Sequence, residues 1–147
     1  GKSGGSMHKA ESLISYIYYG FDQHNLFLRV DPKTAFGDFP PDTVFSINMT
    51  KPFPFKINVT PKGRTVSAEL FEKKKEEWIK IKDVTDIAVQ DILEIAIPFG
   101  DIGAKEKDEL NLFISASKDG EEIERCPWRG YISITVPTPD FEAIMWY

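Results

Sequence analysis

The segment LISYIYYGFDQHNLFLRV, residues 13–30, shows the clearest secondary-structure pattern in the sequence. In its second half, apolar side chains at positions 26, 28 and 30 alternate with Phe27 and Arg29, which places the two sets on opposite faces of a β-strand. The first half, residues 13–19, is another run of strand-forming residues, and the segment 20–25 between the two runs is rich in turn-forming residues. The stretch therefore predicts a β-hairpin.

The same pattern of short β-rich runs separated by turn residues continues along the chain. The segments 61–63 and 73–76 fit hairpin tips, and the only expected helix is a short one over residues 99–104. Seven to nine strands in this pattern predict an all-β, antiparallel β-sandwich that is jelly-roll-like, and immunoglobulin-like in general architecture. Beyond the hairpin, strands are expected over residues 44–49, 55–60, 65–71, 77–81, 92–97, 110–117 and 131–136.

Composition indicates one globular domain, because 41% of the 147 residues are hydrophobic and 28% are charged. Residues 1–6, GKSGGS, look like an expression scar, and we expect residues 7–147 to form a single β-sandwich accessory domain cut from a longer protein. The one cysteine, Cys126, has no partner for an internal disulfide. Localisation stays unknown, with the cytoplasm slightly favoured because nothing in the sequence requires an oxidising compartment.

Charge and hydropathy argue against two classes of partner. The net charge of −5 disfavours nucleic acid, since phosphate binding needs a basic face. No apolar run approaches the roughly 20 residues of a membrane span, so no membrane partner is expected. Plentiful lysine and glutamate with few asparagine and glutamine residues are a composition reported for hyperthermophile proteins, which suggests a thermophilic source.

Polar residues offer little for catalysis. With only His8 and His24, a multi-histidine metal site is out of reach and a histidine-based triad is improbable. Most aspartates stand in turns or at strand ends, where their usual role is turn formation. Glu94 differs because it lies inside the apolar run 92–97, on the face opposite Leu93 and Ile95; a solvated outer face is the simpler interpretation and a ligand contact the alternative. We therefore expect no catalytic residues, no metal and no cofactor.

Aromatic residues are the remaining candidates, because three Trp, five Tyr and eleven Phe exceed what a core requires. An exposed ring can stack on the apolar C–H face of a sugar while polar neighbours bond its hydroxyl groups. Trp78 lies between charged neighbours and shares its strand face with Lys80, whereas Trp128 stands in a loop between two arginines. The sequence therefore predicts carbohydrate binding by Trp78, Trp128, Arg129 and Tyr131, with core packing or a lid over the sandwich end as the alternative for each tryptophan.

Several stretches resemble modules of carbohydrate-active enzymes. MHKAES (7–12), IYYGFD (17–22) and NLFLRVD (25–31) resemble the start of the C-terminal modules attached to family 57 glycoside hydrolases of the α-amylase type. LEIAIPF (93–99) with DIG (101–103) resembles a strand and turn of these modules and of family 9 carbohydrate-binding modules. RCPW (125–128), VPTPDF (136–141) and Trp146 resemble the closing segment of the glucodextranase-type C-terminal domain.

These families belong to the DOMON-like sandwich superfamily, so the resemblance implies a jelly-roll-like sandwich without catalysis. It implies a non-catalytic carbohydrate-binding or accessory domain of a glycoside hydrolase acting on α-glucans, with a poly- or oligosaccharide and the parent catalytic domain as partners. The two tryptophans and the calcium site of family 9 modules have no matching positions here. The main alternative is a purely structural module that packs against the parent domain; haem binding would need axial ligands from Met7, Met49, Met145, His8 or His24.

Overall fold

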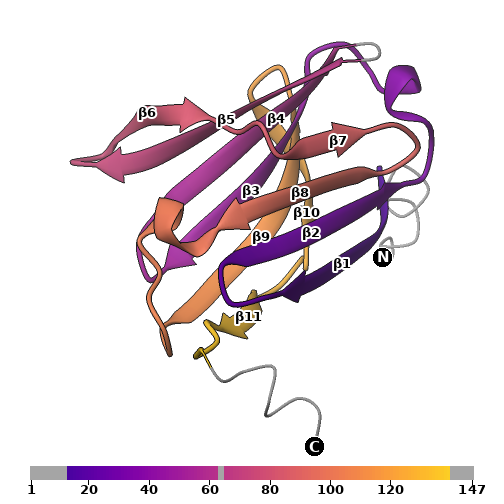
Figure 1. Ribbon diagram of the computed structural model, residues 1–147. Helices are drawn as coiled ribbons and strands as arrows, with labels where there is room; N and C mark the ends of the chain where they lie inside the picture. The colour runs from indigo at the N-terminus through magenta and orange to yellow at the C-terminus, as the bar shows by residue number, and fades with distance from the viewer. Residues whose placement is uncertain (1–12, 63–64, 140–147) are drawn as a thin grey trace, which may run out of the picture.

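Two antiparallel β-sheets pack face to face in this computed structural model, which describes residues 13–62 and 65–139 (Figure 1). The expression scar suggested for residues 1–6 and the terminal Trp146 lie outside the described residues. The prediction of an all-β, antiparallel sandwich is confirmed. The strands are β1 (Ile14–Phe21), β2 (Asn25–Pro32), β3 (Thr43–Lys51), β4 (Phe55–Lys62), β5 (Thr65–Lys74), β6 (Glu77–Asp83), β7 (Ile87–Val89), β8 (Leu93–Pro98), β9 (Glu109–Lys118), β10 (Glu121–Cys126) and β11 (Ile132–Thr135).

The chain passes between the two sheets several times. The smaller sheet, called sheet A, has the order β1-β2-β8-β7, and the larger one, sheet B, has the order β10-β9-β3-β4-β5-β6, with β11 also paired to β9. The β1–β2 hairpin is continued in its sheet by β8, while β3 to β6 form a meander in the other sheet (Figure 1). Sheet A therefore combines two hairpins that are far apart in the sequence.

The core lies between the inner faces of the two sheets, and strict alternation explains it. In β2, Leu26, Leu28 and Val30 are at most 2% exposed, whereas Phe27 and Arg29 face solvent. The alternation predicted for residues 26–30 is thus confirmed. In the other strands too, alternate residues point into the core. The largest fully buried side chains are Phe45, Leu26, Leu28, Ile47, Met49, Ile57, Leu70, Leu93, Ile97, Ile102, Leu110 and Leu112.

Turn chemistry closes the predicted hairpins. Asp22 Oδ1 accepts hydrogen bonds from the backbone N–H groups of His24 (2.8 Å) and Asn25 (2.7 Å), which fixes the β1–β2 turn. Lys75 and Glu76 both have positive φ, 50° and 72°, and form the two-residue connection between β5 and β6, as a tight hairpin with right-handed strand twist requires. The tip expected at residues 73–76 is confirmed.

Two strands were missed by the sequence pattern, so the described residues contain eleven strands rather than seven to nine. β7 has only three residues, which is too short to show a period. β10 reads EEIERC, and its carboxylates look like a solvated loop, although edge strands commonly carry charges. The expected helix over residues 99–104 is a 3-10 helix, η2 (Phe99–Ile102), ended by Gly103 with φ 67°; a second one, η1 (Phe36–Asp38), was not expected.

Glu124 on β10 fixes the beginning of β1 from the opposite sheet. Its Oε1 accepts a hydrogen bond from Leu13 N–H at 2.6 Å, and its Oε2 accepts one from Ile14 N–H at 3.1 Å. A carboxylate that accepts two backbone donors makes charge-assisted bonds, which are stronger than neutral ones. This side chain therefore ties an edge strand of sheet A to an edge strand of sheet B.

Candidate functional site

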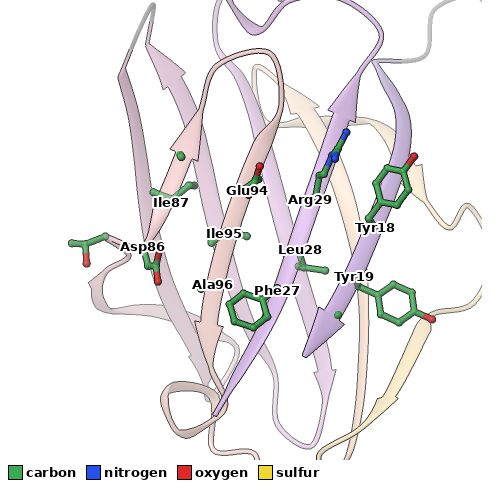
Figure 2. Close-up of a pocket in the computed structure, with 13 residues that line it drawn as sticks. Tyr18, Tyr19, Phe27, Leu28, Arg29, Asp86, Ile87, Glu94, Ile95 and Ala96 are labelled. Carbon is green, nitrogen blue, oxygen red and sulfur yellow. The ribbon is translucent and has the colours of Figure 1, made fainter. Parts of the chain in front are cut away.

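An open groove of about 480 Å³ crosses the outer face of sheet A, the face turned away from sheet B (Figure 2). All four strands of sheet A contribute to its lining, and the segment before β7 closes one side. The lining residues are Tyr18, Tyr19, Gly20, Phe27, Leu28, Arg29, Thr85, Asp86, Ile87, Ala88, Glu94, Ile95 and Ala96.

Strand register brings the outward residues together in a row. Tyr18 on β1 is paired with Arg29 on β2, Arg29 with Glu94 on β8, and Glu94 with Ala88 on β7. Figure 2 accordingly shows Arg29 between Tyr18 and Glu94. One ring, one cation and one carboxylate thus stand side by side across the sheet.

A second row next to the first makes the surface hollow. Gly20, Phe27 and Ala96 are paired across β1, β2 and β8, so two residues without long side chains flank one aromatic ring. A Cβ placed on Gly20 would meet nothing within 4 Å. The space above Gly20 is therefore open, and only the absence of a side chain there keeps it so.

The rings beside this hollow are exposed. Tyr18 is 51% and Phe27 42% exposed, both on the outer face of sheet A. Large aromatic side chains usually bury most of their area, so a pair left exposed beside a hollow is a surface that can bind an apolar face. Tyr19 also lines the groove, but its ring points away from β2 at the sheet edge (Figure 2).

Arg29 is held in a fixed position at the groove. Its Nε donates to Asp31 Oδ1 at 2.7 Å, its Nη2 donates to Asp31 Oδ2 at 3.0 Å, and its guanidinium carbon lies 5.0 Å from the centroid of the Tyr18 ring. The hydrogen bond to Asp31 is the largest cause of the raised pKa of Arg29. A guanidinium oriented in this way presents its remaining N–H donors in one direction.

Two exposed carboxylates complete the polar part of the lining. Glu94 stands on the outer face of β8, opposite the buried Leu93 and Ile95, as the alternation in residues 92–97 predicted. Asp86 precedes β7, and its backbone carbonyl accepts a hydrogen bond from Ala96 N–H at 3.0 Å. Glu94 therefore belongs to a solvated outer face and lines the groove at the same time.

The four residues expected to bind carbohydrate lie outside the groove. Trp78 on β6 is 39% exposed and contacts Lys56, so it shares the outer face of sheet B with Lys80, as predicted. Trp128 is 75% exposed in the loop between β10 and β11, with the Arg129 guanidinium carbon 4.7 Å from its ring centroid. Saccharide binding by these residues stays a prediction.

Sheet B also separates these residues from one another. Tyr131 is 48% exposed and lies 6.1 Å from the Phe113 ring, with Arg125 over both rings. Five inter-strand steps separate β6 from β10, which is about 24 Å at the usual strand spacing. The structure therefore brings Trp128 and Arg129 together, and places Trp78 at the opposite edge of the sheet.

Part of the groove follows from the alternation in the β1–β2 hairpin. The alternation that buries Leu26 and Leu28 also turns Phe27 and Arg29 outward, and the neighbouring run YIYYG offers Tyr18 and Gly20 with the same parity. Exposed aromatic positions on a predicted hairpin could therefore have been identified. Their pairing with Glu94 and Ala96 could not, because these residues are more than sixty positions away in the sequence.

Comparisons with known proteins add no relative: no family model, curated protein or solved structure matches the chain. Within residues 13–62 and 65–139, no three or more His, Cys, Asp or Glu side chains cluster as a metal site would require. None of the helices in this part of the chain is long and apolar enough to cross a membrane.

Proposed function

We propose that the chain is a non-catalytic carbohydrate-binding domain and that the groove on the outer face of sheet A is its binding site. The observation that supports the proposal is the combination of two exposed rings, Tyr18 and Phe27, with an open hollow above Gly20. A sugar ring has an apolar C–H face that fits such rings, and the hollow leaves room for it.

Polar groups around the hollow match the hydroxyl groups of a sugar. Arg29 supplies N–H donors, and its bonds to Asp31 reduce the conformational entropy that binding would cost. Glu94 and Asp86 supply carboxylate oxygens, which accept hydrogen bonds from hydroxyl groups. The lining therefore offers both donors and acceptors around an apolar surface.

The exposure of the two carboxylates supports binding rather than hydrolysis. A glycosidase acid needs a pKa raised by burial in an apolar pocket, and its site excludes water from the reaction. Glu94 and Asp86 are both exposed, on an open sheet face. Release of reducing sugar by the isolated chain would contradict this part of the proposal.

We further propose that the domain serves a glycoside hydrolase acting on α-glucans, with the parent catalytic domain as its second partner. This part rests on the resemblance to C-terminal modules of family 57 glycoside hydrolases and glucodextranases. The rival function is a purely structural module, in which the same exposed rings pack against the parent domain and bind no sugar.

Calorimetric titration of the chain with maltooligosaccharides tests the proposal. We expect saturable heat, and a loss of about tenfold or more in affinity for Phe27→Ala and Tyr18→Ala, since each substitution removes one stacking ring. Trp128→Ala tests the alternative site predicted from the sequence, because it removes a ring outside the groove that is 75% exposed; a loss of affinity in this variant alone would place the site there. Absence of heat with any glucan would contradict the binding function and favour the structural rival.

A further inference from the structure

A cluster of cations and aromatic rings occupies the outer face of sheet B, away from the groove. Register places Asn48, Lys56, Phe71 and Lys80 in one row across β3, β4, β5 and β6. Lys73 is paired with Trp78 in the next outward row. Lys56 and Lys73 both lie at the Trp78 ring.

Lys56 is held between two rings. Its ammonium nitrogen lies 4.5 Å from the centroid of Trp78 and 5.9 Å from that of Phe71. Burial is the largest cause of the lowered pKa of Lys56, and the charge of Lys73 is the second. The rings thus fix a cation in a half-buried position.

The neighbouring Lys80, on the same face, differs from Lys56 because its charge is neutralised. Its ammonium nitrogen lies 2.9 Å from Glu69 Oε2 and 2.8 Å from Asp83 Oδ1, so two carboxylates balance it. Within residues 13–62 and 65–139, no carboxylate is recorded within 4.0 Å of the Lys56 ammonium. Lys56 is therefore a partly desolvated cation without a counter-ion from this part of the chain.

Lys73 adds a second charge at the same ring. Its ammonium nitrogen lies 5.9 Å from the Trp78 centroid, and its carboxylate partner Glu76, at 3.8 Å, is 93% exposed. A pair as exposed as this is screened by solvent and neutralises Lys73 only weakly. Two cations with weak or no neutralisation beside one ring attract an anion, although the chain as a whole carries a net charge of −5.

Hydrogen-bonding groups lie next to this cluster. Ser46 Oγ donates to Asn58 Oδ1 at 2.7 Å, and Asn48 Nδ2 donates to Ser115 Oγ at 3.0 Å. Ser46, Asn48 and Asn58 are half-buried, face the same side as Lys56 and can exchange hydrogen bonds with sugar hydroxyl groups, whereas Ser115 is buried. Glu69 and Asp83 lie beside the cluster, which disfavours a long polyanion such as nucleic acid and favours a short acidic ligand.

We propose that Lys56, Lys73 and Trp78 form a second binding site, which takes the carboxylate group of an acidic saccharide. The carboxylate lies at the two ammonium groups, and the sugar hydroxyls lie at Asn48, in the row of Lys56, and at Asn58, in the neighbouring outward row. The saccharide nature of the ligand rests on the proposed function, whereas the anionic group rests on the contacts of Lys56 alone.

Titration of the full chain with trigalacturonate, compared with a neutral maltooligosaccharide, tests this site. We expect trigalacturonate to bind at low salt and to weaken as salt is added, because exposed charges are screened. Lys56→Gln should lower its affinity about tenfold, the usual effect of losing a charge-assisted hydrogen bond, and Lys56→Arg should restore it in part. Lys80→Gln is the matched control, which removes the same charge from a lysine that two carboxylates already neutralise.

The outcomes separate this proposal from the groove. Phe27→Ala should leave trigalacturonate binding unchanged, and Lys56→Gln should leave maltooligosaccharide binding unchanged. Absence of trigalacturonate binding while the neutral ligand binds overturns only the second site, and the reverse result overturns only the groove. An equal loss in Lys80→Gln, or displacement of trigalacturonate by an equal concentration of acetate, would show a general charge effect or a bare anion site and overturn the proposal.

Discussion

Arg29 and Asp31 form a paired contact at the edge of the groove, with the two guanidinium nitrogens 2.7 and 3.0 Å from the two carboxylate oxygens. Both residues lie on β2 and point outward, so the contact orients Arg29 without linking it to the core. Its expected role is preorganisation for a ligand rather than stabilisation of the fold.

Asp31→Ala should therefore weaken glucan binding without unfolding the protein. Released from its partner, Arg29 would have to be ordered when the sugar binds, and we expect this entropic cost to appear as a severalfold loss of affinity. The melting temperature should change little, since exposed ion pairs contribute little to stability. Calorimetry and a thermal melt measure both quantities. Glu109→Ala, which breaks the remote Lys51–Glu109 pair at 3.9 Å, is the control; equal affinities of the two variants would count against the role of Arg29.

Gly20→Leu should block the groove. No atom lies within 4 Å of a Cβ at this position, and Gly20 lies within a strand, so the new side chain would project into the hollow without strain. We expect glucan binding to be lost and stability to be unchanged or increased by up to about 1 kcal/mol, because glycine is unfavourable in strands. Gly100→Leu is the control, since its Cβ would also meet nothing within 4 Å. Undiminished binding by Gly20→Leu would rule out the groove.

Asp22→Ala should destabilise the β1–β2 turn in a pH-dependent way. The hydrogen bond from His24 N–H is the largest cause of the lowered pKa of Asp22, so the carboxylate contributes stability above its ordinary pKa of 3.8. This contribution is lost as the pH falls through the lower folded-state value. Urea unfolding should show a deficit of about 1 kcal/mol for the variant near neutral pH, which shrinks below pH 3.8. Asp22→Asn is the control, because it keeps an oxygen acceptor without the charge. A deficit of Asp22→Ala that does not change with pH would contradict this account.

Glu124→Gln should weaken the connection between β10 and the beginning of β1. The amide is neutral and retains one oxygen acceptor, so one of the Leu13 and Ile14 N–H groups loses its acceptor and the bond of the other loses its charge. We expect a loss of about 1–3 kcal/mol in the free energy of unfolding, measured in urea. Glu122→Gln on the same strand is the control, because its side chain is exposed. Equal stability of the two variants would show that the hydrogen bonds of Glu124 to β1 do not stabilise the fold.

Local patterns were sufficient to predict most of the sandwich. The period-two alternation through Leu26 and Leu28 determines which face is buried, and the turn residues around Asp22 and Lys75 determine where strands end. β10 could not be predicted in this way, because it is an edge strand. Its carboxylates are typical of exposed sheet edges and do not show the alternation that burial of one face produces. One of them, Glu124, finds its partners only through the tertiary contact with Leu13 and Ile14.

The candidate site was less predictable for the same physical reason. Trp128 and Trp78 attract notice in the sequence as large aromatic residues with polar neighbours, a purely local property. The groove depends instead on small residues, Gly20 and Ala96, placed on either side of Phe27 by strand pairing. The hollow forms where small residues leave space, and pairing between strands that are distant in the sequence decides which small residues become neighbours.

Occupation of the groove on sheet A by a saccharide can be tested by an NMR titration. Backbone amide shifts would be followed while a maltooligosaccharide is added to the ¹⁵N-labelled protein. The account predicts that the largest shift changes fall on Gly20, Phe27, Arg29, Glu94 and Ala96, with little change at Trp128. Saturation without shifts at these five residues, or shifts centred on Trp128 and Tyr131, would contradict it.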